Sequence, residues 1–133
     1  MRLCAIGGNL RFSGYKVNPK HRKNKPKDDC TQWEVDEWTE IKLFTEGMAN
    51  DWVCNDGHIW SIEHSTVVLG DSGNARSKPY YAKFVVDNNH EWHGYPVSSK
   101  RPNDRPPTKV LDSWQKDNLI TKKQQNNITK GRE

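Results

Sequence analysis

The sequence predicts an α+β protein with a small antiparallel sheet of three to four strands, one helix in the N-terminal half and one or two C-terminal helices. Three observations predict this class. Residues 33–46 place apolar side chains three and four positions apart, residues 58–97 contain three runs rich in β-branched and aromatic side chains, and apolar residues return at helical spacing after residue 108. The length of 133 residues fits a single domain, 1–133.

The N-terminal region alternates between apolar and basic stretches. Residues 3–17 hold two short apolar runs around a glycine pair, which favours a first strand or hairpin. Residues 18–29, NPKHRKNKPKDD, contain no apolar side chain, two prolines and five Lys or Arg, which predicts a mobile basic loop. The helix is expected over residues 33–46, although the alternation of Trp33 and Val35 leaves a strand open for its first part.

Three strands are expected next, joined as an antiparallel meander. They are predicted within residues 58–69, 78–87 and 91–96, the last of them cut short by Pro96. Turn signals separate these runs, because each is preceded by a cluster of Asn, Asp, Gly or Ser.

The C-terminal region begins with a proline-rich linker, residues 100–107, in which a helix is disfavoured. Thr108 can then cap a helix that carries Val110, Leu111 and Trp114. Residues 121–133 are polar and basic, and two alternatives stay open for them: a short helix packed against a partner, or a frayed tail.

Composition indicates a thin core in a cytosolic protein. The apolar share is 32%, below the usual 45–50%, and six tryptophans offset part of the shortfall with their large area. No apolar run is long enough to span a membrane, and the first residues lack the apolar region of a secretory signal. Three cysteines at irregular spacing favour free thiols over a disulfide framework.

Charge is strongly segregated along the chain. Residues 1–30 carry eight Lys or Arg against two acids, residues 31–71 carry one against nine, and residues 72–133 carry twelve against six. Basic ends and a pI near 9.0 suit a phosphate backbone, so nucleic acid, RNA or DNA, is the expected partner. The alternative is that the basic ends fold over the acidic middle and the charges neutralise each other within the molecule.

A nucleic-acid-binding surface is expected from residues 78–109 together with the loop 16–27. Aromatic side chains alternate there with cations, an arrangement in which bases stack on rings while Lys and Arg follow the backbone. The candidate binding residues are Lys20, Arg22, Lys23, Lys78, Tyr81, Lys83, Lys100, Arg101, Arg105 and Lys109. No cofactor is expected.

A metal-independent ribonuclease is the alternative function. In HEWHGY, residues 90–95, the side chains of Glu91, His93 and Tyr95 share one face of a strand. Glu91 and His93 would form the acid–base pair, with Tyr95 beside them and His90 as a further candidate. Lys100, Arg101 and Arg105 would stabilise charge on the phosphate.

The order of these elements, a helix followed by a small sheet that bears His, Glu, Tyr and Arg, is similar to that of the barnase and RelE-type ribonucleases. The resemblance lies in element order and includes no family motif. It implies RNA cleavage as the activity.

The sequence bears on two further classes, a zinc protein and a protein–protein interaction module. A zinc site from Cys54 and His58 with a third ligand lacks the close Cys pair that structural zinc sites show, so no metal is expected. A protein–protein interaction module remains an alternative, because the acidic, aromatic segment WEVDEWTEIKLFTE could present a helix to a basic partner; an acidic partner would suit the basic ends. Such a helix more often packs its apolar side on its own sheet.

Overall fold

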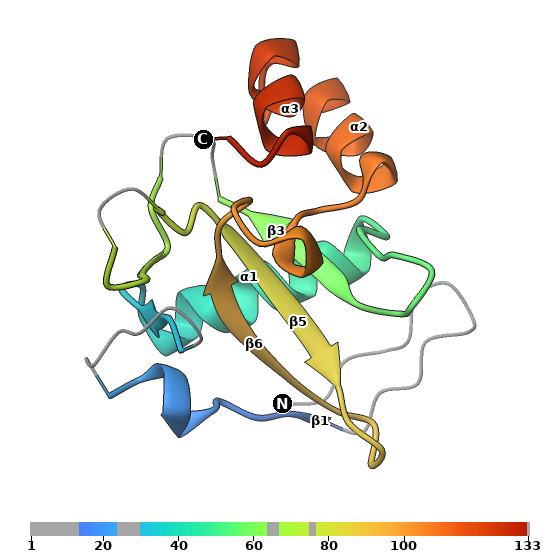
Figure 1. Ribbon diagram of the computed structural model, residues 1–133. Helices are drawn as coiled ribbons and strands as arrows, with labels where there is room; N and C mark the ends of the chain where they lie inside the picture. Colours follow the sequence, from blue (N-terminus) through green and yellow to red (C-terminus); the bar gives the residue numbers. More distant parts are fainter. Residues whose placement is uncertain (1–13, 24–29, 64–66, 75–76, 133) are drawn as a thin grey trace.

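The computed structural model describes residues 14–23, 30–63, 67–74 and 77–132. Within them it confirms the predicted α+β class, with one helix in the N-terminal half, two C-terminal helices, a four-stranded sheet and a separate two-stranded sheet (Figure 1). Of the predicted N-terminal apolar runs, residues 3–13 lie outside the described residues, as do the second half of the predicted basic loop, 24–29, and residues 64–66 and 75–76. No described helix has the length and apolar character needed to cross a membrane.

The main sheet contains the three predicted antiparallel strands. They are β3 (Ile59–Ile62), β5 (Tyr81–Val86) and β6 (Glu91–Val97), in the order β1-β6-β5-β3. Strand β1 (Gly14–Tyr15) pairs in parallel with β6 and makes the sheet mixed. β6 continues through Pro96 because it follows the full length of β5, with Val97 opposite Tyr81.

A second small sheet joins β2 (Gln32–Trp33) to β4 (Gly70–Asp71). The predicted helix therefore starts later than residue 33, as α1 (Glu37–Ala49), after Asp36 caps it by accepting a hydrogen bond from the Thr39 backbone N–H at 2.8 Å. The Trp33 side chain donates its indole N–H to the Gly94 carbonyl at 3.3 Å, which ties this sheet to β6.

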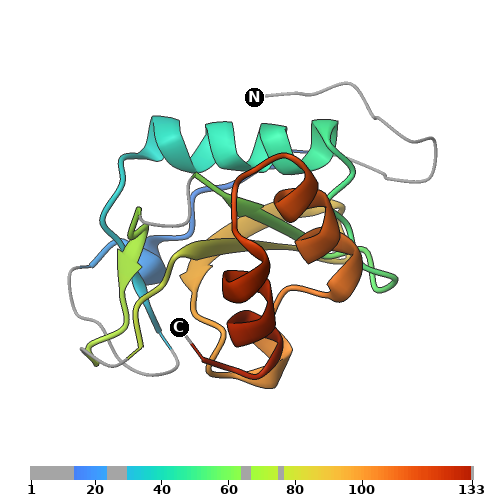
Figure 2. The same cartoon turned by 90° about the horizontal axis from the view of Figure 1, so that it is seen from above.

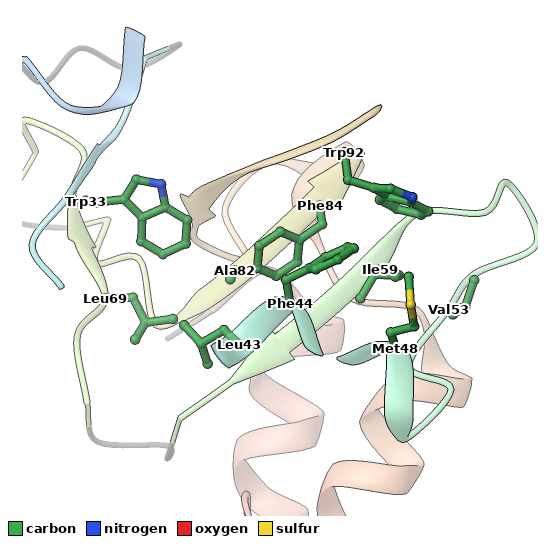
Figure 3. Packing of buried hydrophobic residues seen from close by; sticks show 10 residues of the cluster. All are labelled: Trp33, Leu43, Phe44, Met48, Val53, Ile59, Leu69, Ala82, Phe84 and Trp92. Atoms are coloured by element: carbon green, nitrogen blue, oxygen red, sulfur yellow. The ribbon is translucent and has the colours of Figure 1, made fainter. Parts of the chain in front are cut away.

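Helix α1 covers one face of the main sheet and forms the first core with it (Figures 1 and 2). Figure 3 shows Phe44 of α1 beside Phe84 of β5 and Trp92 of β6; both ring-centroid distances are 5.4 Å. These three side chains are almost completely buried. Large aromatic groups thus supply the core area that the low aliphatic content lacks.

Helices α2 (Thr108–Lys116) and α3 (Lys122–Thr129) pack on the opposite face, at the end where β5 begins and β6 finishes. There Trp114 stacks on Tyr81 with 5.7 Å between ring centroids, and Ile128 of α3 is buried in the same core. Thr121 and Gln124 form a capping box at the start of α3. The opposite end of this face, where β5 ends and β6 begins, extends past α2 and α3.

Candidate functional site

Strand pairing determines which side chains point to the face beyond α2 and α3. Lys83 lies opposite Tyr95, and Val85 lies opposite His93, so these four side chains share the face turned away from α1. Trp92 belongs to the core beneath α1, as the alternation along a strand requires. His93 and Tyr95 therefore face the same way, as the strand pattern predicts.

A cleft of about 360 Å³ opens over this part of the sheet. His93, Tyr95 and Val85 form part of its lining, one wall comes from the segment 18–21, and another comes from the segment that follows β6. The lining residues are Asn18, Lys20, His21, Thr31, Val85, His93, Tyr95, Pro96, Arg101 and Asp104. Its volume is at the lower end of the range for small-ligand sites.

The first wall is the 3-10 helix η1 (Pro19–His21). Polar residues in and near the basic stretch stabilise it. Asn18 caps η1 by accepting a hydrogen bond from the Lys20 backbone N–H at 3.0 Å. The Gln32 side chain then bonds the carbonyl of Lys20 at 2.8 Å and accepts from the Lys23 N–H at 2.5 Å. Buried Gln32 thus fixes both sides of η1 to strand β2.

A buried ion pair anchors the end of the same wall. Arg22 donates to Glu40 Oε1 from Nε at 3.2 Å and from Nη2 at 2.8 Å, and to the Val35 carbonyl at 2.7 Å. Glu40 is 0% exposed and also accepts a hydrogen bond from the Tyr15 hydroxyl. Burial raises the pKa of Glu40, and the bonds from Tyr15 and Arg22 oppose that rise. Arg22 is the residue next to His21, so the pair positions that histidine.

The second wall is η2 (Pro102–Asp104), which the sheet holds from below. Lys83 donates from Nζ to the Asn103 carbonyl at 2.7 Å, and its Nζ lies 3.6 Å from Asp104 Oδ1. The indole N–H of Trp60 donates to the Asp104 carbonyl at 3.1 Å. These bonds place the exposed side chain of Arg101 at the rim of the cleft.

Burial holds His21 as a neutral imidazole, and a hydrogen bond through Nδ1 fixes its tautomer. Its Nδ1 lies 2.6 Å from the Thr31 carbonyl, which can only accept, so Nδ1 carries the proton and Nε2 is the unprotonated nitrogen. Burial lowers the pKa of His21, the Thr31 bond opposes this, and nearby Lys20 and His93 lower it further. A neutral imidazole, with one unprotonated ring nitrogen, is the form that a general base requires.

The other polar groups of the cleft have complementary properties. Burial, together with the charge of Asp104, raises the pKa of Tyr95 to about 12, so its hydroxyl is a hydrogen-bond donor at neutral pH. Arg101 is close enough to Tyr95 to oppose that rise. Nδ1 of His93 is buried and forms no hydrogen bond with any described residue. Two imidazoles, a phenol and a guanidinium therefore line one cavity.

Comparison of the chain with protein-family models, with curated proteins and with solved structures finds no match. Within the described ranges, no group of three His, Cys, Asp or Glu side chains is arranged to hold a metal ion.

The predicted catalytic residues are only partly brought together. His93 and Tyr95 line the cleft, whereas Glu91 and His90 do not. His90 sits in an exposed turn with φ 60°, and the Glu91 backbone N–H bonds the Asp87 carboxylate at 3.0 Å, at the far end of β6. Sequence reasoning missed His21, because a single histidine within a polar, basic stretch has no periodic pattern that indicates a role.

The predicted binding residues separate into exposed and structural groups. Tyr81 and Lys83 are 4% and 6% exposed, and both are engaged in packing or in the support of η2. Arg22 pairs with Glu40, and Arg105 donates to the Ser99 carbonyl at 3.1 Å. Side chains at the surface are Lys20, Lys23, Lys78, Lys100, Arg101 and Lys109, the last of which lies 3.5 Å from Asp51.

Proposed function

We propose that this protein is a ribonuclease that cleaves single-stranded RNA in the cleft between η1 and η2, using side chains and no metal. The observation that carries the proposal is the position of His21 and His93 in one cavity with the Tyr95 hydroxyl and the Arg101 guanidinium. Cleavage of RNA at a phosphodiester needs one group to accept a proton, one to donate a proton and cationic or hydrogen-bonding groups for the phosphate.

The base in this scheme is His21. Its Nε2 takes the proton from a ribose 2′-hydroxyl, and the oxygen attacks the adjacent phosphorus. A new O2′–P bond forms and the P–O5′ bond breaks, which leaves a 2′,3′-cyclic phosphate on one product. His93, as an imidazolium, gives its proton to the departing O5′, so the other product ends in a 5′-hydroxyl.

The remaining groups act on the phosphate. Arg101 at the rim and Lys20 on η1 supply positive charge where negative charge builds up on the phosphoryl oxygens. The protonated Tyr95 hydroxyl can donate a hydrogen bond to one of these oxygens. A positioned donor of this kind is typically worth about 10²–10³ in rate.

The test uses end-labelled single-stranded RNA incubated with purified protein in EDTA. We expect products with 2′,3′-cyclic phosphate and 5′-hydroxyl ends, and loss of cleavage by about 10² or more in His21→Ala and in His93→Ala. His90→Asn and Glu91→Gln are the matched controls, because both residues lie outside the cleft, and Asn accepts the positive φ of position 90. Cleavage that depends on Glu91 and not on His21 would contradict this assignment.

A second candidate is RNA or DNA binding without cleavage. Lys20 and Arg101 line the cleft, and their sequence neighbours Lys23 and Lys100 are exposed as well. These cations favour binding, because they suit a phosphate backbone whether or not the bond is broken. In the same incubation this candidate predicts that RNA is retarded on a gel and keeps its length.

The interaction-module alternative is favoured by one exposed side chain. Trp38 on α1 is 77% exposed, beside acidic residues of the same helix. If RNA is neither retarded nor cleaved at low salt, capture of a basic protein partner by this helix face becomes the informative experiment. For all three candidates we propose a cytosolic location, which the free thiols of Cys30 and Cys54 support.

A further inference from the structure

A second hollow adjoins the cleft. It also measures about 360 Å³, and it lies between the loop after β4 and the segment after β6. Thr31, Arg101 and Asp104 line both hollows, so these three residues form a shared boundary between them. A ligand that extends out of the cleft past Arg101 enters this second space.

The second hollow is rich in small hydrogen-bonding groups. Ser72, Ser77 and Ser98 line it, with Ser77 Oγ 2.7 Å from Ser98 Oγ and Ser72 Oγ donating to the Ser77 carbonyl at 2.5 Å. Asn74 adds an amide, which both donates and accepts. Ser72 donates its proton within the protein, so what remains for the edges of a base or for a ribose hydroxyl is one proton of the Ser77–Ser98 pair and the lone pairs of these oxygens.

The charge of the hollow suits a nucleotide as well. Lys100 and Arg101 line it and both are exposed. The acidic group that it contains, Asp104, lies 3.6 Å from Lys83 Nζ, which compensates its charge. The space therefore presents net positive charge beside neutral hydrogen-bonding groups, the combination that a phosphate followed by a base and sugar requires.

We infer that this hollow is a second nucleotide subsite, which holds the nucleotide adjoining the cleaved phosphodiester of a single-stranded RNA. The inference rests on the proposed ribonuclease function. Single strands are required because a base must be unpaired for its edge to reach Asn74 and the serine hydroxyls. The minimal substrate is then a dinucleotide, and the hollow gives the enzyme a base preference at one position beside the cut.

The test compares two exposed positions of the hollow with a distant cation. Asn74→Ala and Lys100→Ala remove hydrogen-bonding and charged groups from the hollow, and Lys116→Ala removes an exposed cation of α2 outside both hollows. The substrate is a single-stranded RNA pool of random sequence, and sequencing of the product ends gives the base preference. Binding is measured separately by anisotropy, with an oligonucleotide that lacks 2′-hydroxyls and so resists cleavage.

We expect Asn74→Ala to lower kcat/KM and oligonucleotide affinity about three- to tenfold, the loss typical of one hydrogen bond, and to flatten the base preference. Lys100→Ala should lower kcat/KM and oligonucleotide affinity without changing the base preference. Lys116→Ala should leave all three quantities at their wild-type values. If cleavage depends on His93 while Asn74→Ala alters neither affinity nor preference, the subsite is overturned and the cleavage proposal stands. If no cleavage occurs but Asn74→Ala still weakens binding, the cleavage proposal fails and the hollow is a nucleotide-binding site without a catalytic role.

Discussion

The ring of His21 stacks on the ring of Tyr95, with 5.1 Å between centroids and 15° between planes. The contact joins η1 to β6. It holds the imidazole of His21 over the strand that carries His93. It also covers His21, which is 7% exposed. Because burial disfavours the charged form, the stack contributes to the low pKa that keeps His21 neutral at neutral pH.

The first prediction concerns the acid limb of the pH–rate profile. A base must be unprotonated, so kcat/KM on RNA should fall at low pH with a midpoint equal to the pKa of His21 in the free enzyme. That pKa is lowered from 6.5, so the midpoint should lie below 6.5. The measurement is the rate of cleavage of labelled RNA in a buffer series at constant ionic strength.

Two substitutions at Tyr95 provide the control. Tyr95→Phe keeps the ring stack, so the midpoint should stay where it is in the wild type, and only the rate should drop as the hydroxyl is lost. Tyr95→Ala exposes His21 to water, which favours the charged form, so the midpoint should rise toward 6.5. A midpoint that is the same in all three proteins would exclude His21 as the titrating group.

Helix and strand types were predictable because they depend on local patterns, while pairings between distant segments were not. The spacing of Phe44 and Met48 indicates a helix, but its start moves to Glu37 because Gln32 and Trp33 pair with β4. Nothing in the residues of Tyr15 and its neighbours signals a parallel edge with β6. Such pairings follow from the tertiary contacts of a strand.

The candidate site was predictable on one side only. Strand alternation places His93 and Tyr95 together, because a period of two is a local property. Alternation does not say what lies opposite, so it could not reveal that Lys83 binds the Asn103 carbonyl or that His21 faces Tyr95. The missing half of the cleft comes from a segment about 70 residues earlier in the sequence.

The second prediction concerns the buried ion pair behind the first wall. Glu40→Ala leaves the half-buried Arg22 guanidinium without its carboxylate, a change that typically costs about 3–5 kcal/mol of unfolding free energy. Glu37→Ala removes an exposed carboxylate from the first turn of the same helix and should cost less than about 1 kcal/mol. Urea unfolding, monitored by tryptophan fluorescence, measures the unfolding free energy of both variants. Equal losses in the two variants would show that the Arg22–Glu40 pair contributes no more than an exposed carboxylate.

The third prediction tests close packing between β6 and the first core. A methyl group added in Gly94→Ala would overlap the ring of Phe84, which is fully buried and lies opposite it on β5. Overpacking of this kind typically costs about 1–3 kcal/mol. Gly14→Ala is the matched control, since its methyl group would meet no atom of the described residues within 4 Å, and the unfolding free energy of this variant should be unchanged or slightly higher. Thermal unfolding of the two variants side by side checks the difference.

The fourth prediction separates cations that contact RNA from cations that support the fold. Each phosphate contact that is lost should reduce the slope of log Kobs against log salt by about 0.7 for a single strand. In a His93→Ala background, which keeps the RNA intact, Arg101→Ala should show this reduction because Arg101 lies at the rim of both hollows. Lys83→Met should lower affinity through loss of the bond to Asn103, yet keep the wild-type slope, because Lys83 is 6% exposed and bound within the protein. A reduced slope in Lys83→Met would show instead that Nζ of Lys83 leaves η2 to bind phosphate.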